Sequence, residues 1–301
     1  MPTTRVALAG ATGNLGIPVL EALLKGGFSV IVLSRHGGNA SKLQRYQDQD
    51  VTICEVDFTR TESILPALKE VEVAVSCLAT LAIGAQNPLI DACCAAGVRR
   101  FIPAEFGMDS RNALCQQLPV CEPKVATQRY LEHKVSEHPG FTWTGIANGL
   151  FLDWGMQVGF IANLAQHTAT LYNGGDISFS TTTLSDVATA ISGVIQNQEL
   201  TANRLLYVHS TATTQNKLIQ YAKEKDHKDW ALEIKDTNEV MQESLAELQK
   251  GNLQSAMDGF CVAASWNPAY GCDFSSHLDN ELLGIKALDD TGLREIVEKL
   301  L

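Results

Sequence analysis

Short apolar runs alternate with amphipathic stretches along the N-terminal half of the chain. The apolar runs predict buried strands at Arg5–Gly10, Ser29–Ser34, Val51–Val56, Val73–Cys77, Arg100–Pro103 and Thr142–Asn148. Helical spacing of apolar residues predicts helices at Leu15–Lys25, Ala40–Asp48, Glu62–Val71, Gln86–Ala96 and Pro123–Glu137. Such regular alternation indicates a parallel sheet buried between helices. Because crossovers between parallel strands are right-handed, the pattern predicts an α/β fold with a doubly wound Rossmann sheet.

The alternation changes beyond Asn148. The pattern there predicts helices, or an apolar loop in the first case, at Leu150–Leu164, Leu184–Gln196, Thr213–Lys225, Asn238–Lys250, Leu253–Ala264 and Thr291–Leu301. It predicts a hairpin of Thr168–Tyr172 with Asp176–Phe179, and strands at Leu205–His209 and Trp230–Ile234. Since no low-complexity linker separates the halves, we expect a Rossmann domain at 1–155 and a smaller, interleaved C-terminal α+β substrate lobe at 156–301. The strand near 204–209 should rejoin the main sheet.

Three regularly spaced glycines join the first predicted strand to the first helix. The segment reads Gly10-Ala11-Thr12-Gly13-Asn14-Leu15-Gly16. Glycines at such a turn let the backbone approach a pyrophosphate, and the helix N-terminus offers free N–H groups to the phosphates. The spacing therefore predicts a dinucleotide site whose contacts are Gly10, Thr12, Gly13, Asn14, Leu15 and Gly16. The alternative is a glycine-rich turn without a ligand.

The end of the second predicted strand indicates which dinucleotide binds. An Asp or Glu there would bond the ribose 2′-OH of NAD, whereas an Arg suits the 2′-phosphate of NADP. This chain has Arg35, with Lys42 a short distance further on. Two cations favour a phosphate, so we expect NADP(H) as the cofactor. The alternative is an arginine that is only a solvated surface residue.

Composition excludes several other classes of function. The net charge of −11 argues against binding to nucleic acid and to anionic membranes. The N-terminal residues lack the apolar region of a signal peptide, and no apolar run reaches membrane-spanning length, which favours a cytoplasmic protein. The 8 cysteines and 7 histidines show no metal-ligand spacing. We therefore expect reduced thiols and no metal.

Ligands of such sheets bind beyond the carboxyl ends of the strands. Further cofactor contacts are therefore expected at those ends: Asp57, Ser76, Cys77, Phe106 and Asn148. Lys124, at the start of a predicted helix beside this edge, is expected to contact the cofactor as well. Apolar candidates for the substrate pocket follow the fifth and sixth strands: Met108, Phe151, Trp154 and Met156. Asp57 is equally explained as a cap of the next helix, and the apolar residues are equally explained as core.

The lysine best placed for acid–base chemistry is Lys124. Short-chain reductases use a Tyr-x-x-x-Lys pair, and Tyr130-Leu131-Glu132-His133-Lys134 has that form. However, Lys134 lies only 14 residues before Asn148, whereas Lys124 lies 24 residues before it, at the start of the predicted helix. No tyrosine precedes Lys124 at the required spacing, so this lysine would move a proton itself or through water. The alternative is a solvated lysine in the first helical turn.

These motifs together resemble the isoflavone reductase and phenylcoumaran benzylic ether reductase family, in the NmrA-like branch of atypical short-chain dehydrogenases. The residues that carry the resemblance are Gly10–Gly16, Arg35, Phe101-Ile102-Pro103-Ala104-Glu105-Phe106-Gly107, Lys124 and Asn148–Trp154. The resemblance implies that Lys124 relays a proton and that Arg35 binds a phosphate. The segment Asp109–Glu122, with Cys115 and Cys121, differs from the plant pattern, and Phe151–Gly155 is closer to that of microbial, notably fungal, relatives.

The sequence leaves three functions open. The first is an NADPH-dependent reductase that transfers a hydride to an aromatic or enone-like secondary metabolite. The second is an NmrA-like sensor that binds NADP without turnover, and the third is a redox-neutral isomerase or cyclase that uses Lys124 as a base. In each case we expect a small-molecule partner and a monomer or homodimer.

Overall fold

The computed structural model describes residues 3–38, 40–46 and 48–301. Within them, a 7-stranded parallel sheet has the order β10-β6-β5-β4-β1-β2-β3. Its strands are β1 (Arg5–Ala9), β2 (Ser29–Arg35), β3 (Val51–Val56), β4 (Val73–Ser76), β5 (Arg100–Ile102), β6 (Thr142–Ala147) and β10 (Arg204–Tyr207). The strand order reverses between β1 and β4, which confirms the doubly wound α/β fold.

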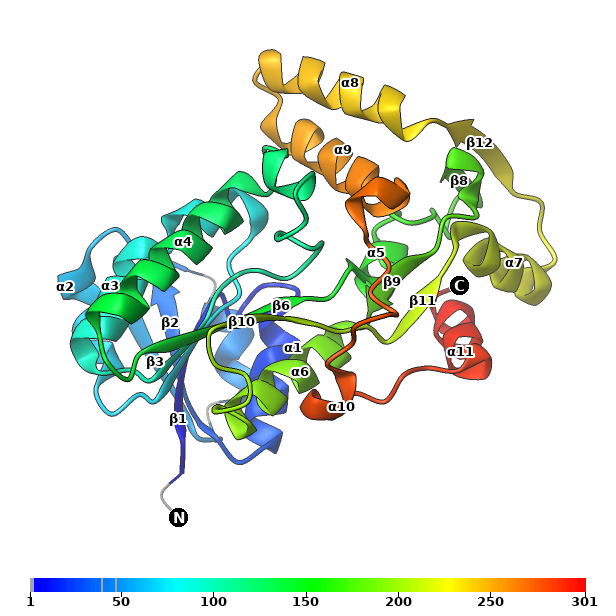
Figure 1. Cartoon of the computed structure of the whole chain (residues 1–301). Helices are drawn as coiled ribbons and strands as arrows, with labels where there is room; N and C mark the ends of the chain where they lie inside the picture. The colour runs from blue at the N-terminus through cyan, green and yellow to red at the C-terminus, as the bar shows by residue number, and fades with distance from the viewer. Residues whose placement is uncertain (1–2, 39, 47) are drawn as a thin grey trace.

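Helices cover both faces of this sheet (Figure 1). Helices α1 (Gly16–Lys25) and α6 (Leu184–Gln196) lie on one face, and α2 (Thr61–Ile64), α3 (Asn87–Ala96) and α4 (Glu122–Glu137) lie on the other. Because successive strand residues point to opposite faces, β1 contributes to two separate cores. Val6 and Leu8 pack in the core with α1 and α6, whereas Ala7 and Ala9 pack in the core with α3.

Two predicted helices of this half are shorter and tighter than expected. The segment Ala40–Tyr46 is a 3₁₀ helix (η1) whose buried side chains, Leu43 and Tyr46, stand three residues apart and so match its period. Residue 47 of the predicted helix lies outside the described residues. The helix expected at Glu62–Val71 is α2 followed by a 3₁₀ turn, Leu65–Leu68 (η2), because Pro66 cannot donate the backbone hydrogen bond of a continuing α-helix.

The second lobe differs from the prediction in its strand pairing, and the expected hairpin is wrong. Strand β8 (Thr168–Tyr172) pairs in parallel with β12 (Ala231–Lys235), and β9 (Phe179–Thr182) pairs with β7 (Leu150–Phe151) and β11 (Thr211–Thr213). The reason lies in Asn173, whose side-chain amide donates to the Thr237 hydroxyl at 2.9 Å and to the Trp266 carbonyl at 3.0 Å. These bonds direct the chain toward the helices of the lobe instead of back along β8.

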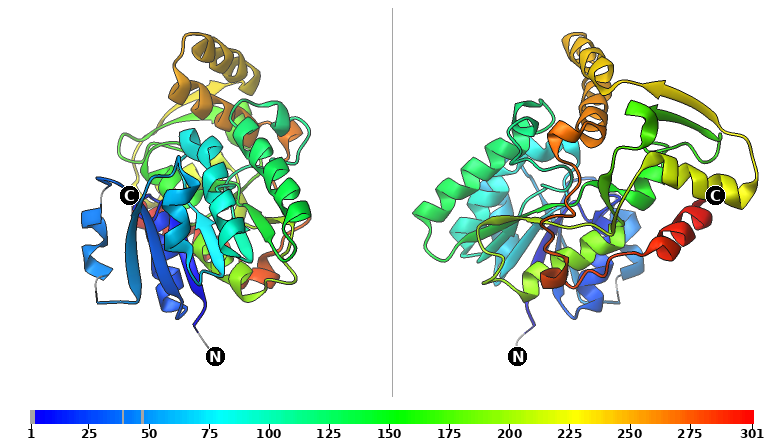
Figure 2. Two further views of the ribbon diagram at one scale, coloured as in Figure 1. Left: turned by 90° about the vertical axis from the view of Figure 1, so that its left-hand side faces the viewer. Right: turned by 45° about the vertical axis from the view of Figure 1, so that its right-hand side comes forward.

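Most of the remaining elements form the lobe on one side of the sheet (Figures 1 and 2). They are α5 (Leu152–Gln157), α7 (Gln215–Asp226), α8 (Thr237–Gln249), α9 (Leu253–Trp266), α11 (Asp290–Leu300) and the 3₁₀ turns η5 (Asn173–Gly175) and η6 (Pro268–Tyr270). Outside the lobe core, α10 (Asn280–Leu283) packs against α6, and the 3₁₀ turn η3 (Thr80–Ala85) packs against α4. The 3₁₀ turn η4 (Cys115–Gln117) lies between α4 and α9. The Trp266 ring anchors the lobe core against the rings of Phe160, Tyr172 and Phe179. None of the helices in the described part of the chain is long and apolar enough to cross a membrane.

The two parts of the chain are interleaved. Strand β10, which follows α6, returns to the edge of the main sheet beside β6. The division expected at residue 155 falls inside α5, whose residues Leu152 and Met156 belong to the lobe core.

The turn between β1 and α1 permits an unusually close backbone approach. A Cβ atom at Gly16 would lie 2.1 Å from the Gly10 carbonyl oxygen and 2.8 Å from the backbone of Ala11. We expect Gly16→Ala to lower the free energy of unfolding by about 1–3 kcal/mol, because backbone atoms must shift. Chemical denaturation of the protein without added ligand measures this change.

The matched control is Gly84→Ala. The nearest atom to a Cβ at Gly84 is the Pro123 Cβ at 3.8 Å, an ordinary contact. This control should change the stability by no more than about 0.5 kcal/mol. Equal stabilities of the two variants would contradict the role assigned to Gly16.

Candidate active site

The amine of Lys124 lies at the carboxyl edge of the sheet. Lys124 stands in the first turn of α4, which also contains Pro123, a residue suited to a helix start because its missing N–H has no partner there anyway. The Nζ atom donates to the carbonyl oxygen of Glu105 at 2.6 Å and to that of Phe106 at 3.2 Å. Only 6 % of Lys124 is exposed. The lysine is therefore fixed against the loop that follows β5, and its burial does not fit the alternative of a solvated lysine.

Gly107 links this loop to the end of β6. Its φ of +146° is a conformation that favours glycine, and a Cβ atom there would lie 3.0 Å from the Lys124 Nζ. The Gly107 carbonyl accepts hydrogen bonds from the backbone N–H groups of Asn148 at 3.0 Å and Gly149 at 2.9 Å. The structure thus brings together Lys124, Phe106 and Asn148, three of the predicted site residues.

The Tyr130 and Lys134 pair lies elsewhere. The Tyr130 hydroxyl donates to Asp91 of α3 at 2.6 Å, and the Lys134 Nζ lies 3.0 Å from the same carboxylate. The bond to Asp91 raises the pKa of Lys134. Ten residues of helix, about 15 Å, separate Lys134 from Lys124 along α4. This pair joins two helices on the outer face of the sheet.

The glycine turn and the end of β4 meet where the strand order reverses. Gly10 has a φ of +79°, and a Cβ atom there would lie 2.4 Å from the Cys77 carbonyl oxygen. Ser76 pairs with Ala9 in the sheet, and its buried hydroxyl has no hydrogen-bond partner among the described residues. Burial raises the pKa of the Cys77 thiol to about 12, so this thiol is not ionised near neutral pH. The switch point of a doubly wound sheet is where ligands bind.

The start of α1 fits a phosphate group. In the described chain, α1 has no side-chain cap at Leu15 and no acidic residue in its first turn. In this turn Pro18 has no N–H and the Ile17 N–H donates to the Gly13 carbonyl at 3.2 Å, so the Gly16 N–H is the one that faces neither a side-chain cap nor a competing carboxylate. Thr12, Gly13 and Asn14 form the turn immediately before this helix, and the Gly13 N–H donates to the Gly10 carbonyl at 3.0 Å.

Two cations flank this turn. Arg35 ends β2 with an exposed side chain, and the Lys42 Nζ donates to the Thr12 carbonyl at 3.4 Å. Asp57, by contrast, closes a local turn, because its carboxylate accepts from the Thr59 N–H at 2.9 Å and hydroxyl at 2.7 Å. These bonds lower the pKa of Asp57. The donor set of backbone N–H groups, a guanidinium and an ammonium fits a phosphorylated dinucleotide.

The predicted apolar pocket residues do not form one group. Phe151 and Trp154 contact each other edge to face with ring centroids 6.2 Å apart, and both are partly exposed. Met108 is buried beside Cys121, with 3.3 Å between the sulfur atoms. Met156 is 1 % exposed within the lobe core. Its position matches the alternative of plain core packing.

The sequence pattern did not indicate that the Glu105 carboxyl group is buried at the site. The side chain is 1 % exposed, and burial raises its pKa. The only signal in the sequence was a charged residue among the apolar and small residues of Pro103–Gly107. A hydrophobicity pattern would place such a residue at the surface.

Comparison with known proteins agrees with this geometry. The model of the NmrA-like family matches residues 2–249. The chain is 32% identical over 255 residues to oxidoreductase aprR of Aspergillus flavus, which covers 83% of this chain and 84% of that protein. It is 28% identical over 222 residues to the isoflavone reductase homolog IRL of Zea mays, covering 70% of each.

Solved structures show the same fold. The binary complex of leucoanthocyanidin reductase with NADPH from Vitis vinifera superposes with a TM-score of 0.80 at 18% identity, covering 98% of this chain and 99% of that chain. The resemblance expected from the motifs is thereby confirmed. The chain belongs to the NmrA-like family, in its isoflavone reductase-like group of oxidoreductases.

Proposed function

We propose that this protein is an NADPH-dependent reductase in which Lys124 relays the proton to a small aromatic or enone-like secondary metabolite. The observation that carries the proposal is the Lys124 amine, held at the carboxyl edge of the sheet by the carbonyls of Glu105 and Phe106. The names of the relatives, which are oxidoreductases and isoflavone reductase homologues, support the same class of reaction.

The two carbonyls orient the lysine. A protonated amine has three N–H donors, and Glu105 and Phe106 accept two of them. The third donor is left for a substrate oxygen or a water molecule at the mouth of the site. In our proposal this N–H gives its proton to the substrate and is later restored from solvent.

The cofactor proposal rests on the turn and the cations beside it. Bound NADPH would supply the hydride for the reduction. The backbone of Gly10 to Gly16 and the start of α1 would hold its pyrophosphate, and Arg35 and Lys42 would hold its 2′-phosphate. Ser76, Cys77 and Asn148 would line the nicotinamide side, because they lie at the carboxyl ends of β4 and β6, on the β4 side of the switch point.

We propose further that the enzyme acts in the cytoplasm, in secondary metabolism, as a monomer or homodimer. All the cysteines from Cys54 to Cys272 lie in the described part of the chain and are free thiols. Free thiols are typical of reducing compartments. In this proposal residues 1–155 and β10 bind the cofactor, and residues 156–301 mainly bind the substrate. Phe151 and Trp154 lie where these two parts meet.

Replacing Lys124 should separate catalysis from cofactor binding. We expect Lys124→Met to lower kcat by about 10²- to 10⁴-fold, the usual contribution of a general acid. NADPH oxidation is measured with a panel of enones, isoflavone-like aromatics and benzylic ethers. NADPH affinity, measured by calorimetry, should change little.

Lys134→Met is the control for that experiment. This substitution removes another amine of α4. The Lys134 amine contacts Asp91 and Tyr130, not the loop after β5. The substitution should leave kcat within about twofold of the wild type, an energy difference of only about 0.4 kcal/mol. A large loss in Lys134→Met, with Lys124→Met fully active, would reverse the assignment.

Replacing Arg35 should change the choice of dinucleotide. We expect Arg35→Ala to weaken NADPH binding by about 10- to 100-fold, since a hydrogen bond to a charged group contributes about 1.5–3 kcal/mol. NADH lacks the 2′-phosphate, so its affinity should not fall. Arg45→Ala is the control, because Arg45 pairs with Glu21 at 3.0 Å and stacks on Tyr46. An equal loss for NADPH and NADH would contradict a 2′-phosphate contact.

A further inference from the structure

Glu105 places an ionisable group in the interior beside the proposed catalytic lysine. Its side chain is 1 % exposed, and its Oε1 atom has no hydrogen-bond partner among the described residues. Buried carboxyl groups normally have complete hydrogen bonding, because an unpaired one costs free energy. A buried acid with a free oxygen therefore needs a functional or a structural reason.

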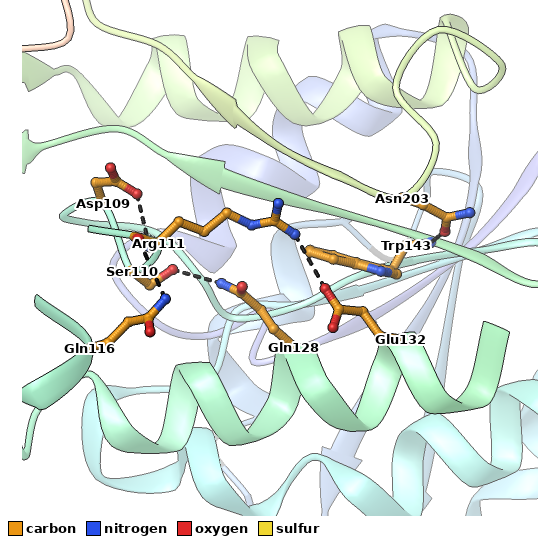
Figure 3. A network of polar contacts seen from close by, with 8 residues as sticks. All are labelled: Asp109, Ser110, Arg111, Gln116, Gln128, Glu132, Trp143 and Asn203. Atoms are coloured by element: carbon orange, nitrogen blue, oxygen red, sulfur yellow. Dashed lines mark hydrogen bonds and ion pairs between the residues drawn. The ribbon is translucent and has the colours of Figure 1, made fainter. Parts of the chain in front are cut away.

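The backbone and the side chain of Glu105 face the same helix. The Glu105 carbonyl accepts from Lys124 at 2.6 Å, and the carboxyl group contacts Ser110 and Gln128. Gln128 follows Lys124 by one turn of α4, and its Nε2 donates to the Ser110 hydroxyl at 2.6 Å (Figure 3). Ser110 and Gln128 are also buried. Lys124 and Glu105 thus belong to one buried cluster of polar side chains, together with Ser110 and Gln128.

Strand β6 leaves the room for this carboxyl group. A Cβ atom at position 145 would lie 3.2 Å from the Glu105 Cγ, so Gly145 allows the side chain to lie against the sheet. The same substitution would also meet Leu205 of β10 at 2.8 Å. The packing of β6 beside β10 therefore leaves the space that the Glu105 side chain occupies.

The groups around Glu105 shift the pKa of its carboxyl group in opposite directions. Burial raises the pKa of the carboxyl group, and the Lys124 ammonium and the bonds from Ser110 and Gln128 lower it. The Asp109 carboxylate raises the pKa of Glu105, as burial does. This carboxylate accepts hydrogen bonds from the Tyr207 hydroxyl at 3.0 Å and from the Arg111 backbone N–H at 2.9 Å. The Glu105 carboxyl group in turn acts on the Cys121 thiol, whose pKa its negative charge raises.

We propose that Glu105 is a positioning residue for Lys124, whose buried carboxyl group supplies the counter-charge of the ammonium and gains a proton when the ammonium gives one up. This inference rests on the proposed function. In the forward reaction, a Lys124 N–H bond breaks and its proton goes to the substrate. Glu105 then forms an O–H bond with a solvent proton, so the interior is not left with a lone carboxylate. When Lys124 regains a proton, Glu105 releases its own, and one solvent proton is consumed per turnover.

The titration of Glu105 tests this without any turnover. The protein is labelled with ¹³C at the glutamate side-chain carboxyl, and the Glu105 resonance is identified by its loss in Glu105→Gln. In Lys124→Met the midpoint should rise by about one pH unit or more, because the stabilising cation is gone. Lys124→Arg keeps the cation and Lys134→Met leaves the site alone, so both should titrate as the wild type does. An unchanged midpoint in Lys124→Met would overturn the proposal.

Kinetics give a second, independent test. Glu105→Gln keeps the size and the hydrogen bonds but cannot carry charge. We expect about a tenfold fall in kcat, which corresponds to one pKa unit, and a shift of the alkaline limb of the pH profile to lower pH. The Kd of NADPH should stay unchanged, and Glu105→Asp should recover part of the rate.

A purely structural Glu105 would behave differently. Glu105→Gln would then lower the melting temperature and the NADPH affinity while the pH profile stayed in place, and this result would overturn the proposal. If the wild type reduces nothing in the panel, the proposed function fails, yet the carboxyl titration still decides whether Glu105 and Lys124 are coupled.

Discussion

The contact of the Lys124 amine with the carbonyls of Glu105 and Phe106 is the interaction on which the site depends. It joins the start of α4 to the loop after β5, while Gly107 joins that loop to the end of β6 through the Asn148 N–H. Three elements that are distant in sequence therefore fix one amine. Since two carbonyls accept two of its hydrogens, the direction of the remaining hydrogen is set by the fold.

The chain buries a second cation in a different way. The Arg100 guanidinium, 1 % exposed, donates to the hydroxyls of Thr142, Thr144 and Thr201 and to the Gln198 carbonyl. Burial lowers its pKa to about 10, so the group stays charged near neutral pH. Arg100 joins β5 to β6 and to the segment that precedes β10. Its permanent charge is stabilised by neutral oxygen acceptors alone. In the proposed mechanism Lys124 exchanges a proton, and it interacts electrostatically with the ionisable carboxyl group of Glu105.

The sequence predicted those features that depend on local spacing. Alternating apolar runs gave the sheet, and the distance of Lys124 from Asn148 distinguished it from Lys134. Features that depend on distant contacts were not predictable. The Asn173 amide, which bonds to Thr237 and Trp266, prevents the hairpin. Room for the Glu105 carboxyl comes from Gly145 in another strand, and the burial of Met156 comes from helices that arrive later in the chain.

The most direct test of the central claim is transfer of deuterium from C4-labelled NADPH to a product, read by mass spectrometry across the substrate panel. The account predicts one deuterium on a product carbon for each NADPH oxidised, with the accompanying proton drawn from solvent. A converted substrate that carries no label, with NADPH unconsumed, would contradict a reductase and indicate a redox-neutral reaction. Tight NADPH binding with no label transferred to any compound would also contradict the account and indicate a sensor.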